Sequence, residues 1–343
     1  MQIGHLFIAD VLWLLFIGLS VSALSQPIPV VEEPVAAPVA ESVQKEPATA
    51  SLCEETAPLW KVYVALTKPR VVSLLLFTTI TAAFVGARGW PGGWVMFAIT
   101  IGGYFAAGAA NAINMVYDRD IDVRMERTAT RPTVTQRISN THALLFALVL
   151  ESISFAVLTM VCNVLSAMLA LGGLLFYVLV YTMALKRRTW QNIVIGGAAG
   201  AFPPLVGYAA VTNTLNPMAW TLFAIVFLWT PVHFWALALL IKDEYKAAGI
   251  PMLPVVHGDR ATVVQIAMYS VLTAVVSLLP LALNQAGWLY LLTVIALNGF
   301  LFIRTFELVK LPERTQARQL FKFSMVYLAL LFLVIAIDRS QVF

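Results

Sequence analysis

Charged residues are scarce in this chain of 343 residues, where they make up 12% of the sequence. A soluble domain carries about 25% charged residues, and with 60% hydrophobic residues this chain cannot cover a surface that faces water. Soluble enzymes, nucleic-acid-binding proteins and disordered proteins are therefore excluded. The hydrophobic residues form continuous runs instead of alternating with polar ones, which argues against a membrane β-barrel. A polytopic all-α membrane protein remains.

Side chains for metal or redox chemistry are also few. The two cysteines, Cys53 and Cys162, show neither metal-site nor redox spacing, so we assign them no function. Only four histidines are present. A haem-binding electron-transfer protein would need paired histidines across a helix bundle, and this small number argues against that class.

Long apolar runs fill most of the chain from Val71 onward. A helix needs about 20 apolar residues to cross the hydrocarbon core. We therefore expect nine membrane spans, at residues 71–87, 94–117, 142–161, 164–185, 192–211, 218–241, 262–283, 287–308 and 320–337.

A tenth apolar run, from Leu6 to Leu24, precedes these spans. No Lys or Arg stands before it, so we favour an uncleaved extra helix in residues 1–25 over a cleaved signal peptide. Residues 26–58 are rich in proline and glutamate and cannot bury a core, so we expect a disordered linker. The predicted organisation is thus an N-terminal helix, this linker and a nine-span domain at residues 59–343.

The basic residues predict how the spans are oriented. Assigned to the predicted loops, 20 of the 22 lysines and arginines fall on one side of the membrane, and only Arg88 and Arg339 fall on the other. This asymmetry supports the number of spans. It also predicts that the loops that follow the even-numbered spans face the cytoplasm or a mitochondrial matrix.

The end of the second span carries side chains that do not suit lipid. Asn111, Asn114, Asp118 and Asp122 are three, four and four residues apart, which places them on one face of a helix. Polar groups at a membrane helix end are costly and usually functional. A stripe of hard oxygen ligands suits Mg²⁺, which prefers one or two carboxylates together with substrate phosphates.

Basic residues lie close to this acidic stripe in the sequence. Arg127 and Arg131 follow it directly, and guanidinium groups bind phosphate oxygens with a planar fork. Acidic and basic groups together predict a metal-bridged diphosphate, over which these two arginines close. Lys186 and Arg187, at the end of the fourth span, could also bind a diphosphate, although topology alone would place basic residues there.

The sixth span ends in a second polar cluster, formed by Lys242, Asp243, Glu244 and Tyr245. It lies four spans after the first cluster, so the two clusters are expected on the same side of the membrane. Two acidic clusters that converge on one cavity could hold Mg²⁺ ions across a diphosphate. Asp243 is the better-placed metal ligand of this cluster.

His233 lies within the sixth span, about two and a half turns before Asp243. Two interpretations stay open: contact with a substrate, including haem iron, or a hydrogen-bonded histidine beside the kink at Pro231. Aromatic faces can stabilise a cation, and four aromatic residues near the helix ends are equally candidates for this role and for ordinary packing. They are Tyr117, Tyr181, Phe234 and Trp235.

These motifs resemble those of the UbiA-type intramembrane prenyltransferase superfamily. Its first motif, Asn-x-x-x-Asp-x-x-x-Asp, is matched by Asn114, Asp118 and Asp122. The stretches 67–79, 111–132, 137–139 and 230–256 resemble, more narrowly, the members that act on haem, and the resemblance covers about residues 59–337. Many members carry a second Asp-x-x-x-Asp motif, but residue 247 is alanine here. The number of metal ions at the second cluster is therefore left open.

The resemblance implies a UbiA-type bundle of nine helices around a central cavity, which opens to the cytoplasmic side of a bacterial cell membrane. It implies transfer of the farnesyl group of farnesyl diphosphate to a vinyl group of protohaem IX, with Mg²⁺ as the cofactor. Haem would be a substrate, and the product would be haem O, the precursor of haem A for terminal oxidases. The implied protein partners are haem A synthase or oxidase assembly factors.

The roles that we expect for individual residues combine these motifs with the resemblance. The expected catalytic residues are Asp118, Asp122, Arg127, Arg131 and Asp243. The expected metal ligands are Asn114, Asp118, Asp122 and Asp243. The expected substrate-binding residues are Asn111, Asn114, Tyr117, Lys186, Arg187, His233, Trp235, Lys242 and Tyr245.

Two other functions are considered. A UbiA-type enzyme could prenylate a quinone precursor, but the stretch 230–256 argues against this. A secondary transporter would carry polar residues near the bilayer midplane. Here the acidic residues cluster at helix ends on one side, which disfavours transport.

Overall fold

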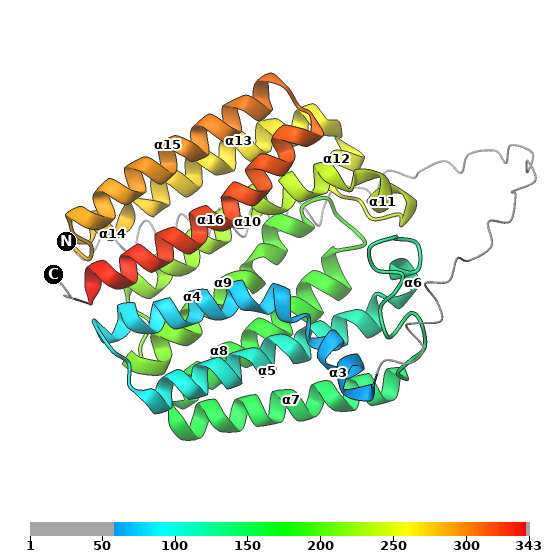
Figure 1. The fold of residues 1–343 in the computed structure, drawn as a ribbon, viewed down its shortest axis with the longest axis horizontal. Coiled ribbons are helices and arrows are strands. Elements are labelled where there is room, and N and C mark those ends of the chain that lie inside the picture. The colour runs from blue at the N-terminus through cyan, green and yellow to red at the C-terminus, as the bar shows by residue number, and fades with distance from the viewer. Residues whose placement is uncertain (1–57, 341–343) are drawn as a thin grey trace, which may run out of the picture. The chain divides into compact units, whose positions relative to one another are not determined.

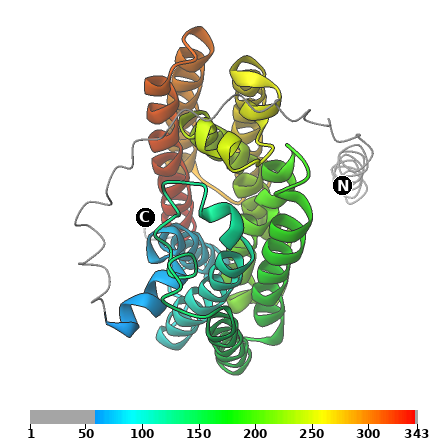
Figure 2. The same ribbon diagram turned by 90° about the vertical axis from the view of Figure 1, so that its right-hand side faces the viewer.

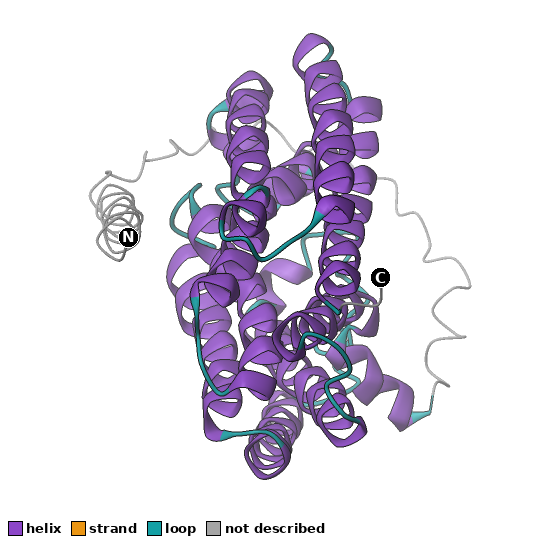
Figure 3. Ribbon diagram, turned by 90° about the vertical axis from the view of Figure 1, so that its left-hand side faces the viewer, coloured by secondary structure: helices purple, strands orange, loops and turns teal. Residues whose placement is uncertain are grey.

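The computed structural model describes residues 58–340, and its regular structure in that range is entirely helical (Figure 3). The expected N-terminal helix at residues 1–25 and the linker up to residue 57 lie outside the described residues. From Tyr63 onward the chain forms one compact unit. This unit contains the residues that carry the predicted chemistry.

Nine helical segments of the described range are long and apolar enough to cross a membrane. The expectation of nine spans is confirmed, and the observed ends differ from the predicted ones by a few residues. The segments are α4 (Pro69–Ala87), α5 (Gly93–Tyr117), α7 (Asn140–Val161), α8 (Val164–Leu175) with its continuation η1 (Phe176–Leu185), α9 (Asn192–Thr212), α10 (Pro217–Leu240), α13 (Gly258–Ser277) with α14 (Leu279–Ala282), α15 (Trp288–Lys310) and α16 (Arg314–Arg339).

Short helices occupy the connections between these spans. α6 (Arg119–Asp122) follows α5, whereas α11 (Lys242–Ala247) and α12 (Leu253–Val256) follow α10. Figures 1 and 2 show α6 and α11 at the same end of the bundle. The two polar clusters of the sequence therefore lie at one end. The remaining short helix, α3 (Leu59–Thr67), immediately precedes α4.

Capping residues explain where several spans begin. Ser139 accepts a hydrogen bond from His142 N at the start of α7, and Asn216 accepts from two backbone amides at the start of α10. Pro217 follows in the first turn of α10, where its missing N–H has no helical partner to lose. Short polar side chains thus satisfy backbone groups at helix ends.

Glycines allow the helices beside α9 to approach closely. A Cβ atom on Gly207 would lie 1.9 Å from the carbonyl oxygen of Thr79 in α4. A Cβ atom on Gly196 would lie 2.3 Å from the ring of Tyr181 in η1. α9 is the most buried span, with 78% of its apolar window inside the protein. It packs against α4, α8 and α10 and thereby fixes the ends of these helices.

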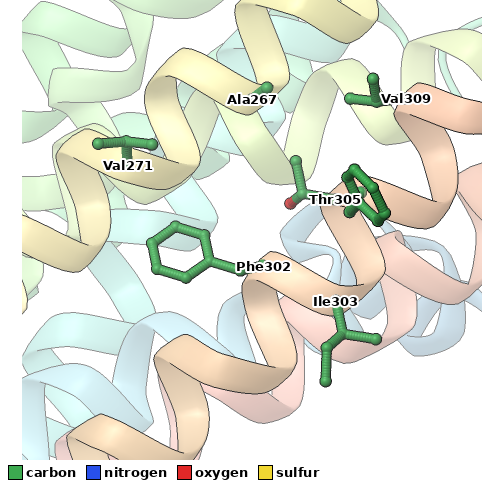
Figure 4. Close-up of a pocket in the computed structure, with 7 residues that line it drawn as sticks. Ala267, Val271, Phe302, Ile303, Thr305 and Val309 are labelled. Atoms are coloured by element: carbon green, nitrogen blue, oxygen red, sulfur yellow. The ribbon is translucent and has the colours of Figure 1, made fainter.

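The outer faces of the spans are apolar. Large side chains such as Leu148 and Met160 on α7 are exposed, as expected of helices that face lipid. Between α13 and α15 lies an apolar pocket of about 440 Å³, lined by residues that include Val271, Phe302 and Thr305 (Figure 4). Thr305 is bonded to Ser270 at 3.0 Å. The pocket contains none of the predicted site residues.

Candidate active site

The acidic stripe lies where α5 gives way to α6. α5 ends at Tyr117, Asp118 is the residue between the two helices, and Asp122 is the last residue of α6. The side chains of Asn114, Asp118 and Asp122 are buried, with exposed fractions of 3%, 0% and 2%. A buried carboxylate needs a nearby cation or strong hydrogen bonds, because desolvation disfavours its charge.

Each buried carboxylate has its own cation. Lys186 Nζ lies 2.5 Å from Asp118 Oδ2, and Arg131 Nη1 lies 2.5 Å from Asp122 Oδ2. Lys186 comes from the residue after η1, and Arg131 from the loop between α6 and α7. Three separate segments therefore meet at the stripe. The sequence-predicted residues Asn114, Asp118, Asp122, Arg131 and Lys186 are brought together here.

Arg187 forms the outer edge of this group. Its guanidinium lies 3.7 Å from Asp118 Oδ1 and donates to both oxygens of Asp120, at 2.7 and 2.8 Å. These hydrogen bonds lower the pKa of the exposed Asp120 carboxyl below its usual range. The guanidinium also stacks over the Tyr117 ring, 4.9 Å from its centroid. Tyr117 itself is exposed.

Lys68 also belongs to the site. In the sequence it was counted only among the basic residues that predict the orientation of the spans. It joins α3 to α4 in a left-handed backbone conformation, with φ of 50°, which is uncommon for a residue with a side chain. Its Nζ donates to Asn114 Oδ1 at 3.2 Å, and Asn111 Nδ2 donates to the preceding carbonyl, Thr67 O. Asn111 thus secures the break in the chain that brings Lys68 into the site.

The surroundings of Lys68 disfavour its positive charge. Burial, together with the charges of Arg131 and Lys186, lowers the pKa of Lys68 to about 7. Among the described residues Lys68 forms no ion pair with a carboxylate. An incoming anion would therefore stabilise its ammonium form.

Two tyrosines of η1 lie beside the carboxylates. The rings of Tyr177 and Tyr181 are stacked with their centroids 5.4 Å apart. The Asp118 carboxylate is close enough to act electrostatically on both rings. Tyr177 was not among the aromatic candidates of the sequence. Its spacing of four residues from Tyr181 would have placed both rings on one helix face.

Two side chains of the second polar cluster, Glu244 and Tyr245, lie near the arginines that follow the acidic stripe. The Arg127 backbone N–H points to Glu244 Oε2 at 3.5 Å. Tyr245 is buried, which raises its pKa, while the charges of Arg127 and Arg131 act on it in the opposite direction. The Arg127 side chain itself is exposed.

The other predicted residues of the second cluster lie apart from the stripe. The Asp243 side chain is exposed and has no hydrogen bond or ion pair with the described residues. Lys242 forms an ion pair with Asp259 at 2.7 Å. Neither residue contacts Asp118 or Asp122 in this arrangement.

His233 and Trp235 face helices other than η1. The His233 ring is stacked between Trp229 and Phe321, at centroid distances of 4.6 and 4.5 Å, and its Nδ1 is bonded to Ser324 at 2.8 Å. Trp235 is fully buried and packs edge-on against Tyr269. These contacts tie α10 to α16 and α13.

The residues of the stripe fit a divalent cation of the Mg²⁺ type. In the described range no group of three or more Asp, Glu, His or Cys side chains is suited to hold a metal. A cation here would have to use two carboxylates, an amide oxygen and oxygens of a ligand, which is the coordination that Mg²⁺ favours. Asp118 Oδ1 is buried and has no hydrogen-bond partner in the described part of the chain. This oxygen accepts no hydrogen bond from the described residues and has only the Arg187 guanidinium nearby, at 3.7 Å, so it is available to a metal ion.

Comparison with known proteins identifies relatives of this chain. Residues 75–331 match the model of the UbiA prenyltransferase family. A protohaem IX farnesyltransferase of Thermus thermophilus is 57% identical over 340 residues, which cover 99% of this chain but 54% of that protein. The chain thus spans about half the length of this relative.

Two further matches cover nearly the full length of the other protein. A protohaem IX farnesyltransferase of Deinococcus radiodurans is 51% identical over 293 residues, which cover 82% of this chain and 94% of the relative. A solved UbiA homologue from Archaeoglobus fulgidus bound to GPP and Mg²⁺ has the same fold, with a TM-score of 0.55 and 18% identity over 80% of this chain and 99% of that one. The chain, whose described residues contain nine candidate spans and a buried Asn-Asp-Asp stripe, belongs to the UbiA prenyltransferase family.

Proposed function

We propose that this protein transfers the farnesyl group of farnesyl diphosphate to a vinyl group of protohaem IX, with release of diphosphate and formation of haem O. The observation that carries the proposal is the pair of buried carboxylates, Asp118 and Asp122, each neutralised by a separate basic side chain. This arrangement suits a ligand that brings both negative charge and a divalent cation.

The choice of substrates is supported by the relatives. The proteins from Thermus thermophilus and Deinococcus radiodurans, at 57% and 51% identity, are both named protohaem IX farnesyltransferase. The bound GPP and Mg²⁺ of the Archaeoglobus fulgidus homologue support a prenyl diphosphate with a metal ion as the donor substrate. Haem is a substrate in this proposal, whereas Mg²⁺ is the cofactor.

Asn114, Asp118 and Asp122 would hold the metal ion. When bound, Mg²⁺ would neutralise the diphosphate and so assist cleavage of the allylic C–O bond. Lys68, Arg131 and Lys186 would bind the remaining phosphate oxygens, and the two residues that now pair with carboxylates would exchange these partners for phosphate. Because these groups are held in place before the ligand arrives, they stabilise the departing charge with little reorganisation.

The stacked rings of Tyr177 and Tyr181 would face the farnesyl cation. Aromatic faces attract a cation through their quadrupoles, and the effect grows where water is excluded. The half-buried position of both rings within η1 supports this role. The haem vinyl group would then attack the cation, which leaves the positive charge on the vinyl unit. Water would add to that carbon and lose a proton, which completes the hydroxyethyl unit.

The proposed setting is a bacterial cell membrane with α6 and α11 on the cytoplasmic side. The concentration of basic residues in the loops at this end of the bundle supports that orientation. A membrane location is consistent with two lipophilic substrates. Haem A synthase or an oxidase assembly factor is the proposed protein partner, because the product is the precursor of haem A for terminal oxidases.

Release of pyrophosphate from farnesyl diphosphate by the purified full-length protein tests the proposal. We expect release only when haem and Mg²⁺ are both present, together with formation of haem O. Asp118→Ala and Asp122→Ala should each abolish turnover, while the protein still folds in detergent. Full activity of either variant in EDTA would refute the metal site. Release that depends on a quinone precursor instead of haem would reassign the acceptor.

A further inference from the structure

The fourth span does not keep one helical geometry to its end. α8 is an α-helix, but η1 is a π-helix, in which backbone hydrogen bonds join residues five apart. At its end Lys186 N donates to Tyr181 O at 2.8 Å in this register. π-Helical segments are rare and frequently occur at functional sites. η1 leads directly to Lys186, the cation of Asp118.

Thr182 makes a hydrogen bond that this geometry allows. Its hydroxyl donates to Tyr177 O, five residues earlier, at 2.9 Å. In α-helices threonine hydroxyls bond to carbonyls three or four residues earlier, as Thr273 does with Tyr269 O at 2.7 Å. A carbonyl oxygen can only accept a hydrogen bond. The single hydroxyl proton of Thr182 is therefore committed to Tyr177.

The hydroxyl oxygen of Thr182 can consequently only accept its second hydrogen bond. Its partner is Asn114 Nδ2, at 3.2 Å. The same nitrogen donates to Asp118 Oδ2 at 2.6 Å, and Lys68 Nζ, which can only donate, faces Asn114 Oδ1 at 3.2 Å. All three neighbours agree on one orientation of the amide, with its nitrogen toward Thr182 and Asp118.

The neighbours differ in how firmly they hold the amide. Thr182 and Asp118 are fully buried, and the Thr182 hydroxyl is fixed by its own backbone bond. Lys68 reaches Asn114 at the end of a flexible side chain, and a metal ion can replace its ammonium group. The amide oxygen is the atom that can bind a cation. Its present partner, the Lys68 ammonium group, is thus the one that can be exchanged for a metal ion.

We propose that Thr182 is a positioning residue for metal–diphosphate binding. Held by the π-helical register of η1, its hydroxyl fixes the Asn114 amide so that the oxygen is presented to cations. The inference rests on the proposed function, in which Asn114 contributes to the metal site. It gives the geometry of η1 a role: a regular α-helix would direct the hydroxyl to a different carbonyl.

Divalent-cation binding without turnover tests this role. Mn²⁺ is titrated into the full-length protein in detergent with inorganic pyrophosphate present, and free Mn²⁺ is followed by electron paramagnetic resonance. Thr182→Val keeps the shape of the side chain but removes the hydroxyl. We expect it to weaken Mn²⁺ binding about fivefold, as for the loss of one hydrogen bond. Thr182→Ser restores the hydroxyl and should bind Mn²⁺ almost as well as the wild type.

Thr273→Val is the matched control. Thr273 is also fully buried, and its hydroxyl bonds to a carbonyl of its own helix. This variant should leave Mn²⁺ affinity unchanged, because Thr273 contacts no residue of the acidic stripe. If Thr182→Val does not accumulate, Thr182→Ala takes its place. Wild-type Mn²⁺ affinity in the variant without the hydroxyl, or equal losses in the serine and valine variants, overturns the inference.

Failure of the proposed function gives a different result. A protein whose Mn²⁺–pyrophosphate binding depends on Thr182, but which does not farnesylate haem, refutes the substrate assignment and supports the role of Thr182. If the protein farnesylates haem but Thr182→Val binds Mn²⁺ normally, the substrate assignment is supported and the role of Thr182 is refuted. A wild-type protein that binds no Mn²⁺ with pyrophosphate overturns the inference together with the metal site.

Discussion

At the level of single residues, the site holds its charges in buried pairs. Asp118 and Asp122 are almost fully buried, and each is paired with a different basic residue. Breaking such a pair by removing one partner leaves an uncompensated buried charge, which is strongly destabilising. Substitutions here therefore need a readout of ligand binding besides stability.

Lys68 should contribute to binding of the donor substrate. Lys68→Met removes the site cation that lacks a carboxylate partner among the described residues. We expect the KM for farnesyl diphosphate to rise roughly tenfold, because hydrogen bonds to charged groups are worth about 1.5–3 kcal/mol. Steady-state kinetics with varied farnesyl diphosphate measure this. Lys246→Met, at an exposed position of α11, is the control, and an equal rise in both variants would contradict the assignment.

Arg131 should act through the shape of its guanidinium. Arg131→Lys keeps the positive charge beside Asp122 but loses the planar fork that binds two phosphate oxygens at once. We expect weaker use of farnesyl diphosphate, by roughly three- to tenfold, with haem binding unchanged. Kinetics for the diphosphate and a haem titration separate the two effects. Unchanged diphosphate kinetics would leave Arg131 as a residue that only neutralises Asp122.

An experiment must decide whether His233 binds haem iron or only packs α10 against α16. Its ring is held by two stacked aromatic rings and by Ser324. If His233 binds haem iron, His233→Ala should shift the Soret band of bound haem and lower haem affinity, while Mg²⁺–diphosphate binding stays intact. An unaltered spectrum would assign His233 to the packing of α10 against α16.

At the level of elements, the site depends on how closely α4, η1 and α9 pack. Gly207 and Gly196 permit contacts that any side chain would prevent. These contacts bring together helix ends from distant parts of the chain. The two buried carboxylates lie after α5, and their cations follow η1 and α6.

Gly207→Ala should destabilise the protein. The added Cβ would lie 1.9 Å from Thr79 O, so α4 and α9 must separate. Overpacking of this kind costs about 1–3 kcal/mol, which should appear as a lower melting temperature in detergent. Gly200→Ala is the control in the same helix, because its Cβ would have no neighbour within 4 Å. A melting temperature that falls equally in both variants would contradict the packing argument.

At the level of the whole molecule, the distribution of charge predicts its orientation in the membrane. Basic residues concentrate at the end of the bundle that carries α6 and α11, whereas Arg88, which follows α4, is assigned to the opposite end. The positive-inside tendency predicts that the basic end faces the cytoplasm.

Cysteine labelling tests this orientation. With Cys53 and Cys162 replaced by serine, Arg124→Cys and Arg88→Cys each introduce one thiol at an exposed position. A membrane-impermeant maleimide added to intact cells should label the cysteine at 88 and spare the one at 124. Labelling in inside-out vesicles should give the opposite result. Labelling of position 124 in intact cells would invert the topology.

The sequence by itself determined the spans and the acidic stripe. Apolar runs of membrane-crossing length can form only helices in lipid, since every backbone group must be bonded internally. The spacing of Asn114, Asp118 and Asp122 places them on one helix face whatever surrounds them. Both features follow from local geometry, and both were therefore readable before the tertiary structure.

Tertiary structure alone decided which partners meet this stripe. Lys68 enters the site through a left-handed backbone break, and Thr182 reaches Asn114 through a π-helical register. Asp243, in contrast, remains exposed and without a partner among the described residues. A prediction from residue spacing presupposes a regular α-helix. It therefore cannot include a break in the helix, a change of helical geometry or the packing of helices that are distant in the sequence. These non-local contacts determine which residues of two similar polar clusters face one another.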